Sequence, residues 1–359
     1  MRDLASVTSK QAVNLPQNNR INRRIVLDSR PIGVPTEANF KLVEGTVPMP
    51  SDGQVLLRTL YLSLDPYMRG RMSDVESYAP SVALDEVMVG STVSVVETSL
   101  NIDYQLGDLV LCANGWQEFA LSDGRGLIKL DNTMLKPSLS LGVLGMPGFT
   151  AYMGLLDIGK PKPNETVVVA AASGAVGAIV GQIAKLKGCN VIGIAGGAVK
   201  CHYVVNDLGF DHCIDHRTSD FTEQLTGACI NGIDIYFESV GGKVFDAVLP
   251  LLNTKARNPV CGMIASYNYT SLPHGPDRLG LLESILLQKR IKMQGFIIYD
   301  DYASKYPEFV KQMNIWLKQG KIKFLEDITY GLENAPQAFT GLFKGKNFGK
   351  SIVSVSAMI

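Results

Sequence analysis

The stretch Thr166–Ala184, with the sequence TVVVAAASGAVGAIVGQIA, is 19 residues long and carries no charged residue. That length approaches the length of a membrane-spanning helix, but the two halves of the stretch differ. The first half is rich in valine, as in a buried strand, whereas the second half is rich in glycine and alanine. We therefore predict a soluble strand, a tight turn and a helix rather than a membrane span.

The turn in this stretch reads Ala172-Ser173-Gly174-Ala175-Val176-Gly177, which is the G-x-G-x-x-G fingerprint with alanine in the first position. Gly174 would let the backbone approach a pyrophosphate, and Gly177 would let the helix pack against the sheet. The free N–H groups at the start of the helix favour an anion. A merely tight turn would explain the motif taken alone, but the strands and helices around it favour a nucleotide site formed by these six residues.

Strands and helices alternate around this turn. Continuous apolar strands that are linked by helices imply a parallel sheet covered on both faces, and six strands complete a dinucleotide-binding fold. We therefore predict an α/β fold with a Rossmann-type, doubly wound parallel sheet. The expected strands are Thr166–Ala172, Asn190–Ala195, His212–Asp215, Ile233–Phe237, Pro259–Ala265 and Met293–Tyr299.

The rest of the 359 residues predicts a second domain. From about Val26 to Lys129, short strands punctuated by glycine and proline indicate a β barrel or sandwich. The tail after about residue 320 breaks the alternating pattern, and we expect it to return to this β domain. The predicted organisation is a poorly ordered extension over 1–20, a β domain made of 21–145 and 320–359, and a nucleotide-binding domain over 146–319.

Composition excludes several classes of function. The chain has 34 Lys plus Arg and 34 Asp plus Glu, so it lacks the basic excess that nucleic acid or an anionic membrane surface would reward. Met1–Arg24 has no apolar core of the kind an export signal needs, and the six cysteines form no C-x-x-C pair. We therefore expect free thiols in the cytoplasm. The cysteines and the four histidines match no zinc template, and we expect no metal site.

The end of the second strand bears on which dinucleotide is bound. An NAD enzyme presents Asp or Glu there to the ribose 2′-hydroxyl, but this chain has Ala195-Gly196-Gly197-Ala198, followed by Lys200. A cation at this place suits a 2′-phosphate, although a solvated lysine on a helix start is the alternative. We predict NADPH as the cofactor, with Gly197 and Lys200 in its site.

Two tyrosine motifs are candidates for chemistry. Ser266-Tyr267-Asn268 is expected to close the fifth strand at the sheet edge where ligands bind, so that Tyr267 could hydrogen-bond a substrate carbonyl or hand it a proton. A surface tyrosine in a loop is the alternative. The second motif, Leu64-Asp65-Pro66-Tyr67-Met68-Arg69, has the composition of a turn, and Arg69 or Arg71 would be a surface cation.

The motifs together resemble one group of enzymes, the zinc-independent medium-chain dehydrogenase/reductases of the leukotriene B4 dehydrogenase, prostaglandin reductase and alkenal reductase type. The resemblance covers nearly all of the chain after about residue 20, and two further stretches look like the bacterial NADPH-dependent curcumin reductase branch. The shared motifs are those at 62–69, 145–152, 171–177, 266–268 and 345–350, and the branch-specific stretches are those at 70–74 and 272–279.

The resemblance implies a GroES-like β-barrel domain beside the Rossmann domain, NADPH in the cleft between them, and a homodimer. It implies that Lys200 meets the 2′-phosphate, that Met146 and Thr150 lie along the cofactor, and that Asn347 holds the nicotinamide end. Tyr67 and Tyr267 would line the substrate site. The implied reaction is hydride delivery to the β-carbon of an α,β-unsaturated ketone or aldehyde, with the enolate oxygen supported by Tyr267 and a ribose hydroxyl of the cofactor.

Two positions depart from the pattern of the group. Ser239 stands where relatives have asparagine before Val-Gly-Gly, which puts one contact near the nicotinamide in doubt. His216 stands where many relatives have a tyrosine at the 2′-phosphate, and its contribution would fall as the pH rises above about 6.5. The alternatives are a zinc-free quinone oxidoreductase, which the tyrosine motifs disfavour, and a non-catalytic NADPH-binding sensor, which would lack the tyrosines or the glycine turn.

Overall fold

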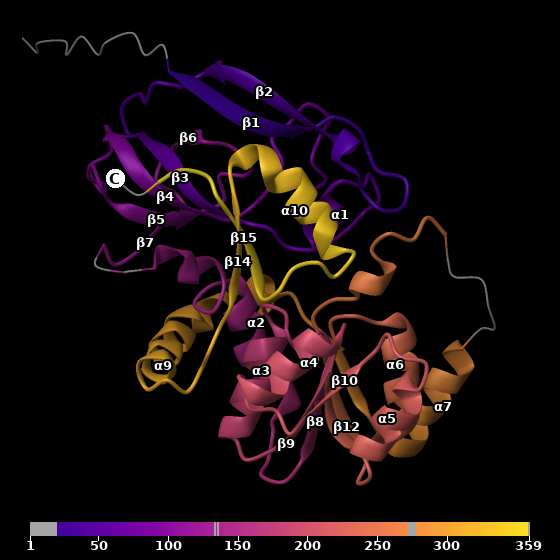
Figure 1. The fold of residues 1–359 in the computed structure, drawn as a ribbon. Helices are drawn as coiled ribbons and strands as arrows, with labels where there is room; N and C mark the ends of the chain where they lie inside the picture. The colour runs from indigo at the N-terminus through magenta and orange to yellow at the C-terminus, as the bar shows by residue number, and fades with distance from the viewer. Residues whose placement is uncertain (1–19, 133, 135, 272–277, 358–359) are drawn as a thin grey trace, which may run out of the picture.

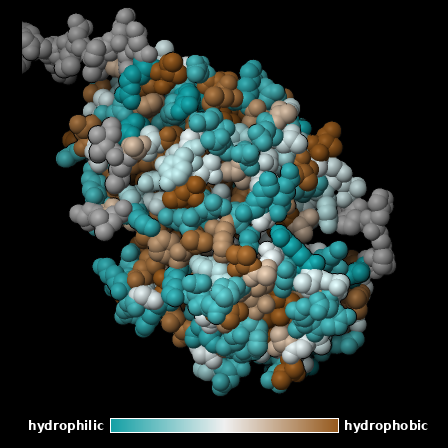
Figure 2. All heavy atoms as spheres, viewed as in Figure 1, coloured by the Kyte–Doolittle hydropathy of each residue, from teal (hydrophilic) through white to brown (hydrophobic). Residues whose placement is uncertain are grey.

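The computed structural model describes residues 20–132, 134, 136–271 and 278–357. Except for Arg20, the extension predicted over residues 1–20 lies outside these residues. Figure 1 shows two lobes, each built around a sheet of its own. On the face drawn in Figure 2, hydrophilic residues cover most of both lobes, with hydrophobic residues scattered among them. No helix in the described part of the chain is long and apolar enough to cross a membrane.

The lower lobe of Figure 1 contains a six-stranded parallel sheet with the order β10-β9-β8-β11-β12-β13. This is the strand order of a doubly wound dinucleotide-binding fold, so the predicted Rossmann sheet is confirmed. Its strands are β8 Thr166–Val169, β9 Asn190–Ala195, β10 His212–Asp215, β11 Ile233–Phe237, β12 Leu252–Val260 and β13 Lys292–Gly295.

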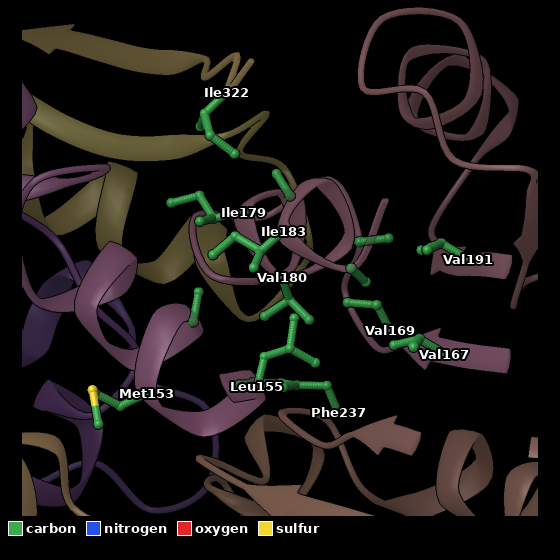
Figure 3. Close-up of a cluster of buried hydrophobic side chains, with 14 of the residues drawn as sticks. Met153, Leu155, Val167, Val169, Ile179, Val180, Ile183, Val191, Phe237 and Ile322 are labelled. Atoms are coloured by element: carbon green, nitrogen blue, oxygen red, sulfur yellow. The ribbon is translucent and has the colours of Figure 1, made fainter. Parts of the chain in front are cut away.

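Helices cover both faces of this sheet. Alternate residues of a strand point to opposite faces, and in β8 the side chains of Val167 and Val169 enter one core while Val168 enters the other. The first core also contains Ile179 and Ile183 of α3, which Figure 3 shows within the same cluster of buried side chains. The helices of the first core are α2 Met146–Met153, α3 Gly177–Leu186, α4 Ala198–Asn206 and α9 Tyr306–Lys318, and those of the second are α5 Phe221–Ala228, α6 Gly242–Val248 and α7 Leu279–Lys289.

The upper lobe contains a seven-stranded sheet with the order β14-β15-β3-β4-β5-β7, in which β6 also pairs with β3. Strands β14 and β15 come from the C-terminal tail, and β15 pairs antiparallel with β3. The tail therefore lies in the β domain, beside the N-terminal strands (Figure 1). The strands are β3 Val55–Ser63, β4 Thr92–Ser99, β5 Leu109–Cys112, β6 Phe119–Ser122, β7 Ile128–Lys129, β14 Glu326–Tyr330 and β15 Lys350–Ser354, with a separate hairpin of β1 Ile21–Leu27 and β2 Phe40–Thr46. The boundaries proposed at 145 and 319 stay a prediction.

Three of the expected strands are wrong in their bounds. The first, β8, ends at Val169, three residues before its expected end. The last strand ends at Gly295, and the short helix α8 Ile298–Tyr302 follows it. The run looked like a strand because Phe296 and Ile298 are apolar and buried, yet the Asp301 carboxylate accepts the N–H of Ile297 at 2.9 Å and so starts a helix. The fifth strand, β12, ends at Val260, five residues before its expected end.

Candidate active site

The glycine turn follows the carboxyl end of β8 and leads into α3. The N–H of Gly174 donates to the carbonyl of Ala171 at 2.8 Å, and Ala171 itself has a left-handed φ of +46°. A Cβ on Gly177 would lie 2.4 Å from the same carbonyl oxygen, so no other residue fits there. The six predicted residues therefore form one tight turn in front of the helix N-terminus, as a pyrophosphate site requires.

Basic side chains lie close to the Gly196–Gly197 turn that follows β9. A Cβ on Gly196 would lie 3.0 Å both from Nε of Arg217 and from Nε2 of His216. Lys200, in the first turn of α4, donates to the carbonyl of Gly345 at 2.8 Å. The structure thus brings the predicted residues Gly197, Lys200 and His216 together and adds Arg217, which the sequence analysis missed. The signal was its place directly after His216, beyond the end of β10.

Burial, together with mutual repulsion, lowers the pKa values of Lys200 and His216 in this cluster. Burial lowers the pKa of Lys200, Arg217 lowers it further, and Asp327 opposes both effects. Partial loss of solvent also lowers the pKa of His216, together with the charges of Arg217 and Lys200 and against the effect of Asp215. With its pKa below 6.5 the imidazole is neutral at pH 7, so Lys200 and Arg217 carry the positive charge that a phosphate would meet.

Two other predicted cofactor residues lie beside the glycine turn. Ser239 follows β11, and its hydroxyl donates to the carbonyl of Ala170 at 3.5 Å. The Asn347 amide donates to the carbonyl of Gly349 at 3.0 Å, and Gly349 forms a parallel bridge with Gly174. The C-terminal tail therefore touches the turn directly.

Met146 and Thr150 lie on the first turn and a half of α2. Thr150 is buried, and its hydroxyl donates to the carbonyl of Met146 at 2.8 Å within the helix. The roles predicted for Met146, Thr150, Ser239 and Asn347 toward a cofactor stay predictions.

Tyr67 and Tyr267 come from different lobes. Tyr67 precedes the short helix α1 Met68–Arg71 after β3, whereas Tyr267 follows a 3-10 helix, Ile264–Ser266, in the loop after β12. The expectation that Tyr267 closes a strand is therefore wrong, because the strand stops at Val260 and a loop carries the tyrosine onward.

Electrostatic contacts relate the two tyrosines to a third. Burial raises the pKa of Tyr67 well above its usual value of 10, and Asp65, Tyr78 and Tyr299 raise it further while Arg71 opposes them. Burial also raises the pKa of Tyr267; the N–H of Met263 lowers it, and Cys261 and Tyr78 raise it. Both phenols thus stay protonated at neutral pH and sense the same neighbour, Tyr78. Tyr78 and Tyr299 were missed because nothing in their local sequence distinguishes them from other surface tyrosines.

A buried ion pair joins two of the sequence motifs. Lys350, the first residue of β15, donates to Asp65 at 3.1 Å and to the carbonyl of Leu64 at 2.8 Å. The hydroxyl of Ser63 donates to the other oxygen of Asp65. Burial lowers the pKa of Lys350, which Asp65 partly offsets. The segment that leads into Tyr67 is therefore held to the strand that follows the Asn347 loop.

Arg69 is not the surface cation that its sequence context suggested. Its side chain is buried, and the guanidinium bonds to acceptors in two other segments. Arg71 is half-buried and donates to the carbonyl of Pro80. Charged residues of a turn motif usually face water, so sequence alone could not reveal the burial of Arg69.

Metal ligands are sparse in the described part of the chain. No group of three or more His, Cys, Asp or Glu side chains there could hold a metal ion, and all six cysteines are free. His274 lies outside the described residues. The zinc-free expectation stays a prediction.

Comparison with known proteins identifies the family. The NADPH-dependent curcumin reductase of Escherichia coli (strain K12) is 62% identical over 340 residues, which cover 95% of this chain and 99% of that protein. The chain belongs to the medium-chain dehydrogenase/reductase family. Another family member, the NADP(+)-dependent 2-alkenal reductase of Nicotiana tabacum, is 40% identical over 93% of this chain and 98% of its own.

Family models and a solved structure agree with this assignment. A model described as the N-terminal domain of oxidoreductase matches residues 23–130, and one described as zinc-binding dehydrogenase matches residues 175–314. The crystal structure of CurA in complex with NADPH from Vibrio vulnificus is 62% identical, with a TM-score of 0.92 over 94% of this chain and all of that chain. The predicted fold class and the family resemblance are confirmed.

Proposed function

We propose that this protein is an NADPH-dependent reductase of the carbon–carbon double bond in α,β-unsaturated ketones and aldehydes. The observation that carries the proposal is the hydrogen bond of 3.1 Å between Arg69 and Asn268, which brings the segments of Tyr67 and Tyr267 together across the two lobes. The glycine turn and the Lys200–Arg217 cations lie at the carboxyl edge of the same Rossmann sheet. The curcumin and alkenal reductases among its relatives support the same reaction class.

The chain's own residues fit a dinucleotide 2′-phosphate. Gly177 leaves no room for a Cβ beneath the turn, and Lys200, His216 and Arg217 gather where an NAD enzyme would place a carboxylate. The glycine turn would hold the pyrophosphate, and Lys200 with Arg217 would hold the 2′-phosphate. When bound, NADPH supplies the hydride that reduces the β-carbon.

Tyr267 would act on the substrate oxygen. Reduction at the β-carbon moves negative charge to the carbonyl oxygen, and a hydrogen-bond donor placed there stabilises that charge as it develops. The raised pKa of Tyr267 keeps its phenol in the donor form throughout the neutral range. Tyr67, half-buried and protonated like Tyr267, would line the other side of the site and exclude water.

The proposed activity is tested by following the absorbance of NADPH with an enone, with a quinone and without an acceptor. We expect rapid oxidation with enones and background oxidation alone without an acceptor. If NADPH is oxidised only with the quinone, the protein is the alternative, a zinc-free quinone oxidoreductase. Background rates with every acceptor, alongside tight NADPH binding, would assign a non-catalytic sensor and contradict the proposal.

Replacing Lys200 with alanine should raise KM for NADPH by about 10- to 100-fold, because charge-assisted hydrogen bonds contribute about 1.5–3 kcal/mol. KM for NADH should not change, since NADH lacks the 2′-phosphate. The matched control is Lys187→Ala, because Lys187 is exposed and lies just after α3, at the end of the helix away from the glycine turn. Equal changes in the KM values for NADPH and NADH would show that Lys200 does not bind the 2′-phosphate.

We infer a homodimer that acts in the cytoplasm. Helix α7 has no buried residue although it is mostly apolar, and Leu279, Leu281 and Leu287 are 58%, 55% and 80% exposed. The neighbouring strand β13 lies at the edge of the described sheet with its second side unpaired. A second copy of the chain could cover the helix and pair with the strand. Light scattering should return twice the chain mass of 38.9 kDa, and the monomer mass would contradict the dimer.

A further inference from the structure

Arg69 is a buried cation that lacks an acidic partner among the described residues. Its side chain is only 6% exposed, and burial alone lowers its pKa. Every ion pair found in the described part of the chain involves other residues. Burying a charge without a counter-ion is costly, so the hydrogen bonds that the guanidinium makes require an explanation.

The guanidinium of Arg69 connects three segments that are distant in sequence. Its Nε donates to Oδ1 of Asn268 at 3.1 Å. One of its terminal nitrogens donates to the carbonyl of Gly33 at 2.9 Å and to that of Pro31 at 3.3 Å. The planar guanidinium presents donors in fixed directions, which suits a group that holds several segments at set angles.

The two ends of the Arg69–Asn268 bond lie beside the two candidate site tyrosines. Arg69 is two residues after Tyr67, on the four-residue helix α1, and Asn268 directly follows Tyr267. Tyr67 follows a strand of the β domain, whereas Tyr267 follows a strand of the Rossmann domain. Neither segment is part of a sheet, so neither is fixed by a strand ladder of its own. The bond therefore links both tyrosine segments directly across the junction of the lobes.

We propose that Arg69 and Asn268 are positioning residues that fix Tyr67 and Tyr267 relative to each other across the two domains. This inference rests on the proposed reductase function, in which both phenols face one substrate. Neither residue touches the substrate in this proposal.

The test uses Asn268, because it is half-buried and its replacement should leave the fold intact, unlike replacement of Arg69. In the full-length protein, Asn268→Leu should lower kcat/KM for an enone by about 10- to 100-fold, the size of effect that a small misplacement of reacting groups causes. The Kd for NADPH should stay unchanged. Asn268→Asp keeps an acceptor oxygen for Arg69 and should restore activity to near the wild-type level. Tyr269→Phe, an exposed residue of the same loop, is the control.

A second readout does not depend on enone activity. Amide hydrogen exchange in the loop that contains Tyr267 and Tyr269 should accelerate in Asn268→Leu and stay at the wild-type rate in Asn268→Asp and in the control. Wild-type activity and wild-type exchange in Asn268→Leu, or equal losses in the leucine and aspartate variants, would overturn the positioning pair. A wild-type enzyme without enone activity would overturn the proposed function, and the exchange rates would still decide whether the pair holds the loop.

Discussion

Tyr267→Phe is expected to lower kcat/KM for an enone by about 100- to 1000-fold, as loss of one donor to a developing oxyanion does in other enzymes. The loss should fall mainly on kcat, because the carbonyl oxygen of the bound substrate carries little of the negative charge that develops in the transition state. The Kd for NADPH should stay unchanged. In the structure, the N–H of Met263 donates to the phenol oxygen at 3.4 Å, so the hydroxyl proton remains free for the substrate.

The pH dependence separates a hydrogen-bond donor from a base. Because burial raises the pKa of Tyr267 above its usual value of 10, the phenol is protonated at all lower pH values. Wild-type kcat/KM should therefore be insensitive to ionisation of this tyrosine below pH 10 and fall only as the pH passes its raised pKa. An activity that rises with pH through this range would indicate that the phenolate is the active form.

Tyr269→Phe serves as the control, since it removes an exposed phenol two residues away. We expect wild-type kinetics from it. If Tyr267→Phe retained more than about a tenth of wild-type kcat/KM, the hydroxyl would stabilise the transition state by less than about 1.4 kcal/mol. The proposed role of Tyr267 would then be wrong.

The sequence predicted the central fold because its signals there are local. The valine run, the glycine turn and the helix after it are adjacent in the chain. The turn requires glycine at position 177, because the Cβ of any other residue there would strike a carbonyl oxygen. Continuous apolar runs indicated all six strands of the Rossmann sheet. Their bounds were wrong at the end of β8, at the end of β12 and at β13, where the residues of a turn, a loop and a short helix have the same apolar composition as strands.

The sequence predicted less of the site, because its missing members act across the fold. Arg69 looks like a turn cation, but it is buried against Asn268 of the other lobe and the carbonyls of Pro31 and Gly33. Arg217 becomes part of the cofactor region only when β10 lies beside β9 and its guanidinium reaches the Gly196–Gly197 turn. Burial and distance between remote segments are set by tertiary packing, which the pattern of one segment does not contain.

Lys350→Met is expected to destabilise the protein by about 3–5 kcal/mol, the cost of removing one partner of a buried ion pair. The lysine is 4% exposed, and its ammonium bonds to Asp65 and to the carbonyls of Leu64 and Ser351. Methionine fills much of the same volume but leaves the Asp65 carboxylate buried with only the Ser63 hydroxyl as a side-chain donor. Urea denaturation should show a lower midpoint with an unchanged slope.

A matched pair elsewhere in the chain tests whether burial causes this loss. Lys185 and Asp211 form an ion pair whose side chains are each 34% exposed, and Lys185→Met should cost about 1 kcal/mol or less. Equal costs for Lys185→Met and Lys350→Met would contradict the buried-pair explanation. Adding Asp65→Asn to Lys350→Met removes the unpaired charge and should recover part of the lost stability. Because Lys350→Met is less stable, it should also lose enone activity at urea concentrations that leave the wild type active.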